Sequence, residues 1–172
     1  MNIVLIGFMG AGKSTVGKLI AQKLKRKFYD CDELIVQKTE LSIEEIFRLY
    51  GEIKFRTIET EVLKNLSRLE DVVIATGGGA ITRYRNVELI KKNGVVIYLY
   101  ADLLELYERI KKDKTKRPLV ADKNFFNTMA RLISQREELY DKIADIKIDT
   151  TVKTTQEVLR DIIKELKNRG YL

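Results

Sequence analysis

A glycine-rich segment near the start of the chain has the residue types and spacing of a phosphate-binding loop. Residues 7–14 consist of Gly7, four variable positions, and then Gly12, Lys13 and Ser14. Glycines let the backbone curl so that its N–H groups face anionic oxygens. Lys13 can reach the outer phosphates of a nucleotide, and the hydroxyl of Ser14 can ligate Mg²⁺. The segment therefore predicts binding of a nucleoside triphosphate.

Two carboxylates follow the next apolar run, at Asp30 and Asp32. At the carboxyl end of a strand they can face the phosphate-binding loop, where one can hold a metal-bound water and the other a substrate hydroxyl. The alternative is a turn in which Asp32 caps the helix that follows it. The pattern alone leaves both interpretations open. Cys31 between them has the character of a small packed residue.

Three glycines, Gly77, Gly78 and Gly79, follow a further apolar run at 72–75. Glycines at such a place let another molecule approach the backbone closely, although a tight turn would also account for them.

Three arginines stand out by their positions. Arg136 falls on the apolar helical stripe of Ile133 and Tyr140, where it is expected to meet either an anionic ligand or an internal acid. Arg56 flanks another apolar stripe, with Glu59 three residues on as a possible partner. Arg117 lies in a polar, lysine-rich stretch at about 111–124 that we interpret as a mobile lid or a surface loop.

The elements that must position these residues alternate along the chain. Short apolar runs predict strands at 2–6, 27–30, 72–75, 94–100 and 144–148. Helical periodicity predicts helices near 13–26, 33–50, 52–68, 83–92, 102–112, 125–141 and 155–168. Capping boxes are indicated at 42–45 and 154–157, and Gly51 is a plausible stop between two helices. Alternating strands and helices predict an α/β fold in which helices cover both faces of a parallel sheet.

Composition excludes several classes of protein. The 172 residues suggest one domain, and they contain no histidine, which removes histidine bases and histidine-ligated zinc. The single cysteine excludes an internal disulfide and suits a reducing compartment. No apolar stretch approaches a membrane span, and because the first predicted strand begins at residue 2 we expect no signal peptide. The net charge of +7 is scattered, so most basic side chains are expected on solvated helix faces.

Taken together, these motifs resemble the shikimate kinase family over nearly the whole chain. The specific part is the combination of the phosphate-binding loop with Phe55-Arg56, residues 77–79, Arg117-Pro118-Leu119, and Arg136 with Leu139-Tyr140. The resemblance implies a three-layer αβα P-loop kinase fold with strand order 2-3-1-4-5 and a lid at about 111–124. It implies one domain over 1–172, with substrate-binding helices at about 33–61. The implied reaction moves the terminal phosphoryl of ATP onto the 3-hydroxyl of shikimate, a step of aromatic amino acid biosynthesis.

The resemblance also implies a role for each site residue on the nucleotide side. Ser14 would ligate Mg²⁺, and Asp30 would hold the ion through water. Lys13 and Arg117 would act on the transferring phosphoryl group. Arg109 and the loop at 149–153 would lie near adenine. Lys153 stands there where relatives often carry an arginine, and a lysine can neither stack on a base nor form the paired hydrogen bonds of a guanidinium. The implied ATP-binding residues are Gly10, Ala11, Gly12, Lys13, Ser14, Thr15, Arg109, Arg117 and Lys153.

On the acceptor side, the resemblance implies that Asp32 binds the accepting hydroxyl and that Arg56 and Arg136 grip the substrate carboxylate. The backbone of Gly78 would contact the ring hydroxyls, and Gly77 and Gly79 would belong to the same substrate-binding set. We expect a cytoplasmic monomer that takes ATP, Mg²⁺ and shikimate and binds neither nucleic acid nor membrane.

Three rival functions remain to be weighed. Another small-molecule or nucleoside monophosphate kinase would need a base pocket in place of paired arginines. A switch-type GTPase would carry an aspartate with glycine at the third position after it and an asparagine-lysine-any-aspartate motif, and the chain has neither. A nucleic-acid-binding ATPase would bind RNA or DNA with steep salt dependence.

Overall fold

The fold is built on a parallel five-stranded sheet. We describe it from a computed structural model, which defines residues 1–112 and 124–172. The strand order is β2-β3-β1-β4-β5, and all four neighbouring pairs are parallel. The predicted order 2-3-1-4-5 is confirmed. The strands are β1 (Asn2–Ile6), β2 (Lys27–Asp30), β3 (Val72–Ala75), β4 (Gly94–Tyr100) and β5 (Ile146–Asp149).

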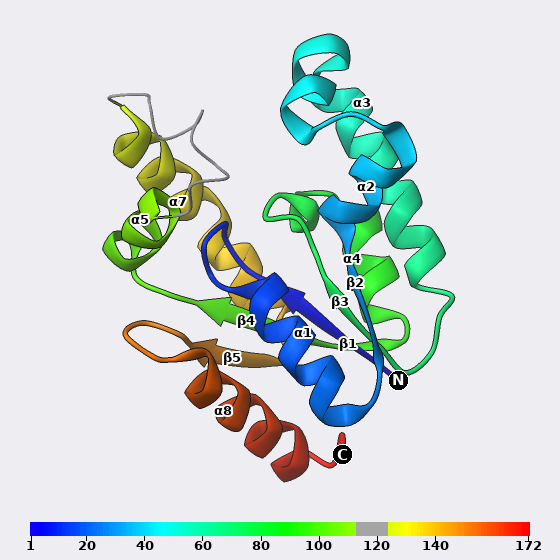
Figure 1. The fold of residues 1–172 in the computed structure, drawn as a ribbon, viewed down its shortest axis with the longest axis vertical. Coiled ribbons are helices and arrows are strands. Elements are labelled where there is room, and N and C mark those ends of the chain that lie inside the picture. The colour runs from blue at the N-terminus through cyan, green and yellow to red at the C-terminus, as the bar shows by residue number, and fades with distance from the viewer. Residues whose placement is uncertain (113–123) are drawn as a thin grey trace.

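Helices cover both faces of this sheet and give three layers (Figure 1). One face packs against α1 (Lys13–Leu24), α5 (Leu103–Lys112) and α8 (Thr155–Asn168). The other face packs against α2 (Cys31–Thr39), α3 (Ile43–Leu66) and α4 (Tyr84–Lys91). The long helix α7 (Phe125–Ile143) contributes its N-terminal part to the first cluster and its C-terminal part to the second. A short 3₁₀ helix, η1 (Ala80–Thr82), joins β3 to α4.

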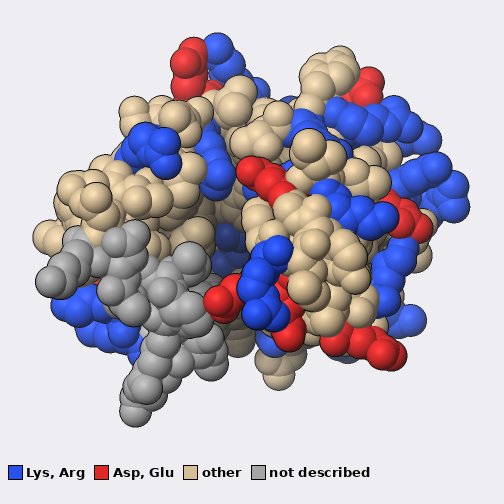
Figure 2. Space-filling view, turned by 90° about the horizontal axis from the view of Figure 1, so that it is seen from above, with Lys and Arg blue, Asp and Glu red and all other residues tan. Residues whose placement is uncertain are grey.

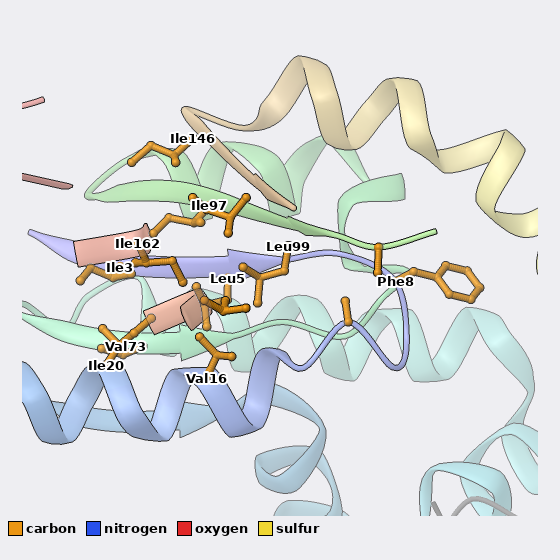
Figure 3. Packing of buried hydrophobic residues seen from close by; sticks show 14 of the residues in the cluster. Ile3, Leu5, Phe8, Val16, Ile20, Val73, Ile97, Leu99, Ile146 and Ile162 are labelled. Atoms are coloured by element: carbon orange, nitrogen blue, oxygen red, sulfur yellow. The ribbon is translucent and has the colours of Figure 1, made fainter. Parts of the chain in front are cut away.

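The central strand β1 is apolar on both faces because both are covered. Ile3 and Leu5 belong to the cluster that packs on α1 and α8, whereas Val4 and Ile6 belong to the opposite cluster. Figure 3 shows Val16 and Ile20 of α1 beneath the first pair. Because helices pack on both faces, the sheet is rigid. The loops at its carboxyl edge therefore begin from fixed positions.

The predicted helix at 33–50 is wrong as one element. The chain leaves α2 at Glu40, which has a left-handed φ of 56°, and α3 starts after Ser42. The capping box between Ser42 and Glu45 is present as predicted and accounts for this restart. Gly51, with φ of 75° and ψ of 173°, breaks the helical geometry inside α3 and marks a kink there.

Smaller differences concern element ends. The last strand covers Ile146–Asp149 rather than 144–148, because Asp145 turns its carboxylate to the backbone N–H of Val96. The short helix η1 is not among the elements predicted from the sequence. The predicted lid at 111–124 lies outside the described residues, apart from its first two residues and its last.

Candidate active site

A cavity of about 560 Å³ opens at the carboxyl edge of the sheet. Figure 2 views this end of the molecule and shows a central hollow bordered by both basic and acidic side chains. The residues lining it follow β1, β2, β3 and β5, as expected for a ligand site in a parallel sheet. They are Met9–Val16, Asp30, Asp32, Thr76, Gly78, Glu105, Arg109, Thr150, Lys153, Thr155 and Val158.

The predicted phosphate-binding loop forms the floor of this cavity: its residues from Gly10 to Ser14 line the cavity, and so does Thr15, which follows the loop. Gly10 and Gly12 have positive φ angles of 81° and 88°, which glycine adopts without strain. The ammonium of Lys13 donates to the carbonyls of Gly7 and Phe8, at 2.8 and 2.9 Å. Helix α1 begins at Lys13, so its free N–H groups and its positive dipole end face the cavity.

The side chains of Ser14 and Asp30 contact each other at the N-terminus of α1. The Ser14 hydroxyl donates to Oδ2 of Asp30 at 2.5 Å, while Oδ1 of Asp30 accepts from the backbone N–H of Asp32 at 2.9 Å. Asp30 is therefore the N-cap of α2, and the alternative that made Asp32 the cap is wrong. Asp32 lies in the first turn of α2, is exposed, and lines the cavity.

The Ser14–Asp30 pair has the chemistry of a Mg²⁺ site, since hydroxyl and carboxylate oxygens are the ligands that this ion prefers. Within the described residues, no group of three or more His, Cys, Asp or Glu side chains could cage a metal. An ion at Ser14 and Asp30 would therefore take its remaining ligands from phosphate oxygens and water, as Mg²⁺ does in kinases.

The acceptor-side residues gather around the glycines after β3. A methyl group added at Gly77 would lie 2.8 Å from Oε1 of Glu59 and 3.0 Å from Oδ1 of Asp32. One added at Gly79 would lie 2.2 Å from Nη2 of Arg56. Glycine at both positions therefore lets these charged side chains approach the backbone closely, which a tight turn alone would not explain. Gly77, Gly79 and Arg56 do not line the cavity themselves but lie beside its Asp32–Gly78 end.

Glu59 holds the guanidinium of Arg56 in this cluster. Nη1 of Arg56 lies 2.9 Å from Oε2 of Glu59, whose side chain is fully buried, so the partner suggested by the sequence is confirmed. Burial raises the pKa of Glu59 above its ordinary value, and Arg56 opposes that rise. The sequence pattern indicated only the helix neighbour Arg56 for Glu59; the carboxylate also lies beside Gly77, a residue that is distant in sequence.

Arg136 approaches the same region from α7. Its guanidinium carbon lies 6.0 Å from the ring centre of Phe8, within the phosphate-binding loop. Among the described residues no acid forms an ion pair with it, so the internal-acid alternative has no support there. The charges of Arg136 and Arg56 both oppose the rise that burial causes in the pKa of the Tyr140 phenol. Arg136 does not line the cavity.

Arg109 and Lys153 lie on the opposite side of the cavity. Nη1 of Arg109 donates to Oγ1 of Thr150 at 3.0 Å, and Nε donates to Glu105 at 2.8 Å. The guanidinium is thus fixed between α5 and the loop after β5. Lys153 lines the cavity, but its ammonium pairs with Asp161 of α8 at 2.9 Å. Arg117, the remaining predicted site residue, lies outside the described residues.

Comparison with known proteins identifies relatives of this arrangement. A sequence model of the family described as shikimate kinase matches residues 9–167. A shikimate kinase of Thermodesulfovibrio yellowstonii is 46% identical over 164 residues, covering 95% of this chain and 94% of the relative. A shikimate kinase of Caldicellulosiruptor bescii is 42% identical over 162 residues, covering 94% and 93%.

Solved structures agree with the sequence relatives. A shikimate kinase from Acinetobacter baumannii in complex with shikimate superposes with a TM-score of 0.92 at 39% identity, over 98% of this chain and 93% of that one. A shikimate kinase from Aquifex aeolicus superposes with a TM-score of 0.85 at 38% identity, over 99% and 98%.

Proposed function

Because the chain belongs to the shikimate kinase family, we propose that it transfers the terminal phosphoryl group of ATP to the 3-hydroxyl of shikimate. The products are shikimate 3-phosphate and ADP, and the reaction is a step of aromatic amino acid biosynthesis. One observation carries the proposal in this molecule. Asp32, Arg56 and the glycines 77–79 form one cluster at the end of a cavity whose floor is a phosphate-binding loop.

On the nucleotide side, the protein's task is to fix the triphosphate and neutralise its charge. The backbone N–H groups of residues 10–15 and the dipole of α1 would bind the phosphates, and Lys13 would turn from its carbonyl partners to the transferring group. Arg109 would flank the nucleoside, since α5 and the loop after β5 hold it at the cavity wall. Lys153 would contribute charge rather than stacking.

Ser14 and Asp30 would hold Mg²⁺, and their contact supports that assignment. When bound, the ion would neutralise charge on the phosphate oxygens. Asp30 is positioned for this task by its second oxygen, which caps α2 and so prevents the carboxylate from rotating.

On the acceptor side, Arg56 and Arg136 would bind the carboxylate of shikimate. Guanidinium groups bind carboxylates through paired hydrogen bonds, and Glu59 pre-orients that of Arg56. Asp32 would accept a hydrogen bond from the attacking hydroxyl, orient it in line with the phosphoryl group, and receive its proton as the new O–P bond forms. Arg117 of the predicted lid would complete the neutralisation of charge.

We further propose that the protein acts as a cytoplasmic monomer on small molecules. Across the described ranges no helix combines the length and apolar character that a membrane crossing requires. The one cysteine is buried and free, which suits a reducing compartment. Sedimentation of the purified protein tests the monomeric state.

A coupled assay of ADP release tests the function. Purified protein with ATP and Mg²⁺ is expected to release ADP rapidly with shikimate but only at background level with quinate or gluconate. The Asp32→Asn variant is the matched control for contaminating kinases, because it changes one acceptor-side oxygen to nitrogen. Equal rates with all three acceptors, or equal rates in wild type and variant, would contradict the proposal.

A further inference from the structure

The hydroxyl of Tyr140 links helix α7 to the glycine loop of the acceptor side. Tyr140 is 2% exposed, and its ring stacks on that of Tyr98, with ring centres 4.9 Å apart and planes at 19°. Its hydroxyl donates a hydrogen bond to the carbonyl of Gly78, 62 residues away in the chain. A phenol buried to this degree cannot reach a substrate in the cavity, so its effect must pass through the groups that it contacts.

Gly78 differs from its two glycine neighbours in the kind of group that donates a hydrogen bond to its carbonyl. The carbonyls of Gly77 and Gly79 accept from the backbone N–H groups of Ala80 and Thr82, each at 3.1 Å. The carbonyl of Gly78 accepts from Tyr140 instead, through a side chain of another element. Gly78 is also the one of the three that is partly exposed and lines the cavity.

Tyr140 also lies on the face of α7 that presents Arg136. The two residues are four positions apart, and residues at this spacing share one side of a helix. Helix α7 therefore supplies both Arg136 and the donor that holds Gly78. The carboxylates of Asp32 and Glu59 occupy the space where a side chain at Gly77 would lie, and the guanidinium of Arg56 occupies that at Gly79.

We propose that Tyr140 is a positioning residue of the acceptor site: its hydroxyl fixes the Gly78 backbone relative to Arg136 and thereby sets the spacing of the groups that bind shikimate. The proposal rests on the proposed function. Three successive glycines have more conformational freedom than any other tripeptide, and one hydrogen bond from a rigid helix restricts the middle one. The stack on Tyr98 restricts the phenol in turn.

The phenol remains a donor under all ordinary conditions. Burial raises the pKa of Tyr140 to about 12, and the charge of Arg136 opposes part of that rise. The hydroxyl is therefore protonated throughout the neutral range in which the enzyme would be assayed.

The test compares Tyr140→Phe with Tyr98→Phe. Each variant removes one tyrosine hydroxyl and keeps both rings of the stack, but only the first removes the bond to Gly78. We expect Tyr140→Phe to raise the KM for shikimate roughly three- to tenfold, the range for loss of one hydrogen bond, with the KM for ATP unchanged. Tyr98→Phe is expected to leave both KM values at the wild-type level. An unchanged shikimate KM in Tyr140→Phe, or an equal rise in Tyr98→Phe, overturns the proposal.

Amide hydrogen exchange in the absence of ligands provides a readout that needs no turnover. Tyr140→Phe is expected to accelerate exchange at residues 77–80 several-fold more than Tyr98→Phe does, and equal exchange in the two variants overturns the proposal. This experiment also separates the two hypotheses. A wild-type protein that fails to phosphorylate shikimate contradicts the proposed function alone, whereas unchanged exchange contradicts the positioning role of Tyr140 alone. If Tyr140→Phe is too unstable to assay at the usual temperature, exchange is measured in the cold.

Discussion

Asp30 and Asp32 are two positions apart, yet the fold gives their carboxylates different surroundings. Asp30 is 9% exposed and is engaged on both oxygens, by Ser14 and by the N-terminus of α2. Asp32 is exposed to the cavity and lies against Gly77. The same residue type can therefore hold a metal ion at one position and an acceptor hydroxyl at the other.

We predict that Asp32→Asn lowers kcat by about two to four orders of magnitude, the range for loss of a positioned proton acceptor. ATP binding, measured by calorimetry, should remain at the wild-type level because Asp32 lies at the acceptor end. Asp30→Asn serves as the comparison and is expected to raise the Mg²⁺ concentration needed for half-maximal rate. If Asp32→Asn weakened ATP binding as strongly as it lowered kcat, the assignment to the acceptor side would be wrong.

A second prediction uses the contact between Gly79 and Arg56. In Gly79→Ala the new methyl group would occupy the place of Nη2, so the flexible arginine must move while the backbone stays. Loss of one charge-assisted hydrogen bond is worth about 1.5–3 kcal/mol, so the KM for shikimate should rise at least about tenfold. The Tm should change little.

Glu52→Gln is the control for this prediction, because it changes the exposed partner of Arg56 Nε and places no atom against Nη2. Steady-state kinetics of the two variants give the comparison. A rise in KM that is equal in both would show that displacement of Arg56 is not the cause.

At the scale of elements, the two capping boxes explain where α3 and α8 begin. In each, the hydroxyl at the N-cap accepts from the third helical N–H, and the glutamate at that third position accepts from the backbone N–H of the cap. We predict that Ser42→Ala lowers the free energy of unfolding by about 1 kcal/mol. Urea titration measures the change, and Ser67→Ala at the other end of α3 is the control, with an expected loss below about 0.5 kcal/mol. Equal losses would contradict the assignment.

The same box predicts a dependence on pH. Hydrogen bonds from the Ser42 hydroxyl and N–H lower the pKa of Glu45. A carboxylate with a lowered pKa stabilises the fold above its ordinary pKa, and this contribution disappears as the pH falls through the lowered value. The stability difference between wild type and Glu45→Gln should therefore be largest near neutral pH and vanish in acid. Denaturant titrations across this range test it, and a constant difference would contradict it.

The elements also show what the sequence could and could not predict. Strands were placed well because apolar runs of four to seven residues between helices have few alternative structures. The phosphate-binding loop could be predicted because the residues that bind phosphate are contiguous in the sequence. The break at Glu40 was missed because it depends on a left-handed residue that is not glycine. The burial of Glu59 and the bond from Tyr140 to Gly78 were missed because each joins segments that are distant in sequence.

At the scale of the whole molecule, the two halves of the core correspond to the two proposed substrates. The cluster containing α1, α5 and α8 supports Lys13, Arg109 and Lys153 on the nucleotide side. The opposite cluster, containing α2 and α3, supports Asp32 and Arg56 on the acceptor side. Helix α7 contributes to both clusters and carries Arg136, so it fixes the position of the nucleotide side relative to the acceptor side.

This division predicts that each ligand stabilises the protein through its own residues. A ligand at about a hundred times its Kd adds about 2.7 kcal/mol to the free energy of unfolding, which raises the Tm of a chain of this size by about 5–11 °C. Shikimate and ATP with Mg²⁺ should each produce such a rise in scanning calorimetry. Arg136→Ala should abolish the rise with shikimate and keep that with nucleotide, whereas Lys13→Ala should do the reverse. If one variant abolished both, the two ligands would share a site, and the assignment of the two core clusters to separate substrates would fail.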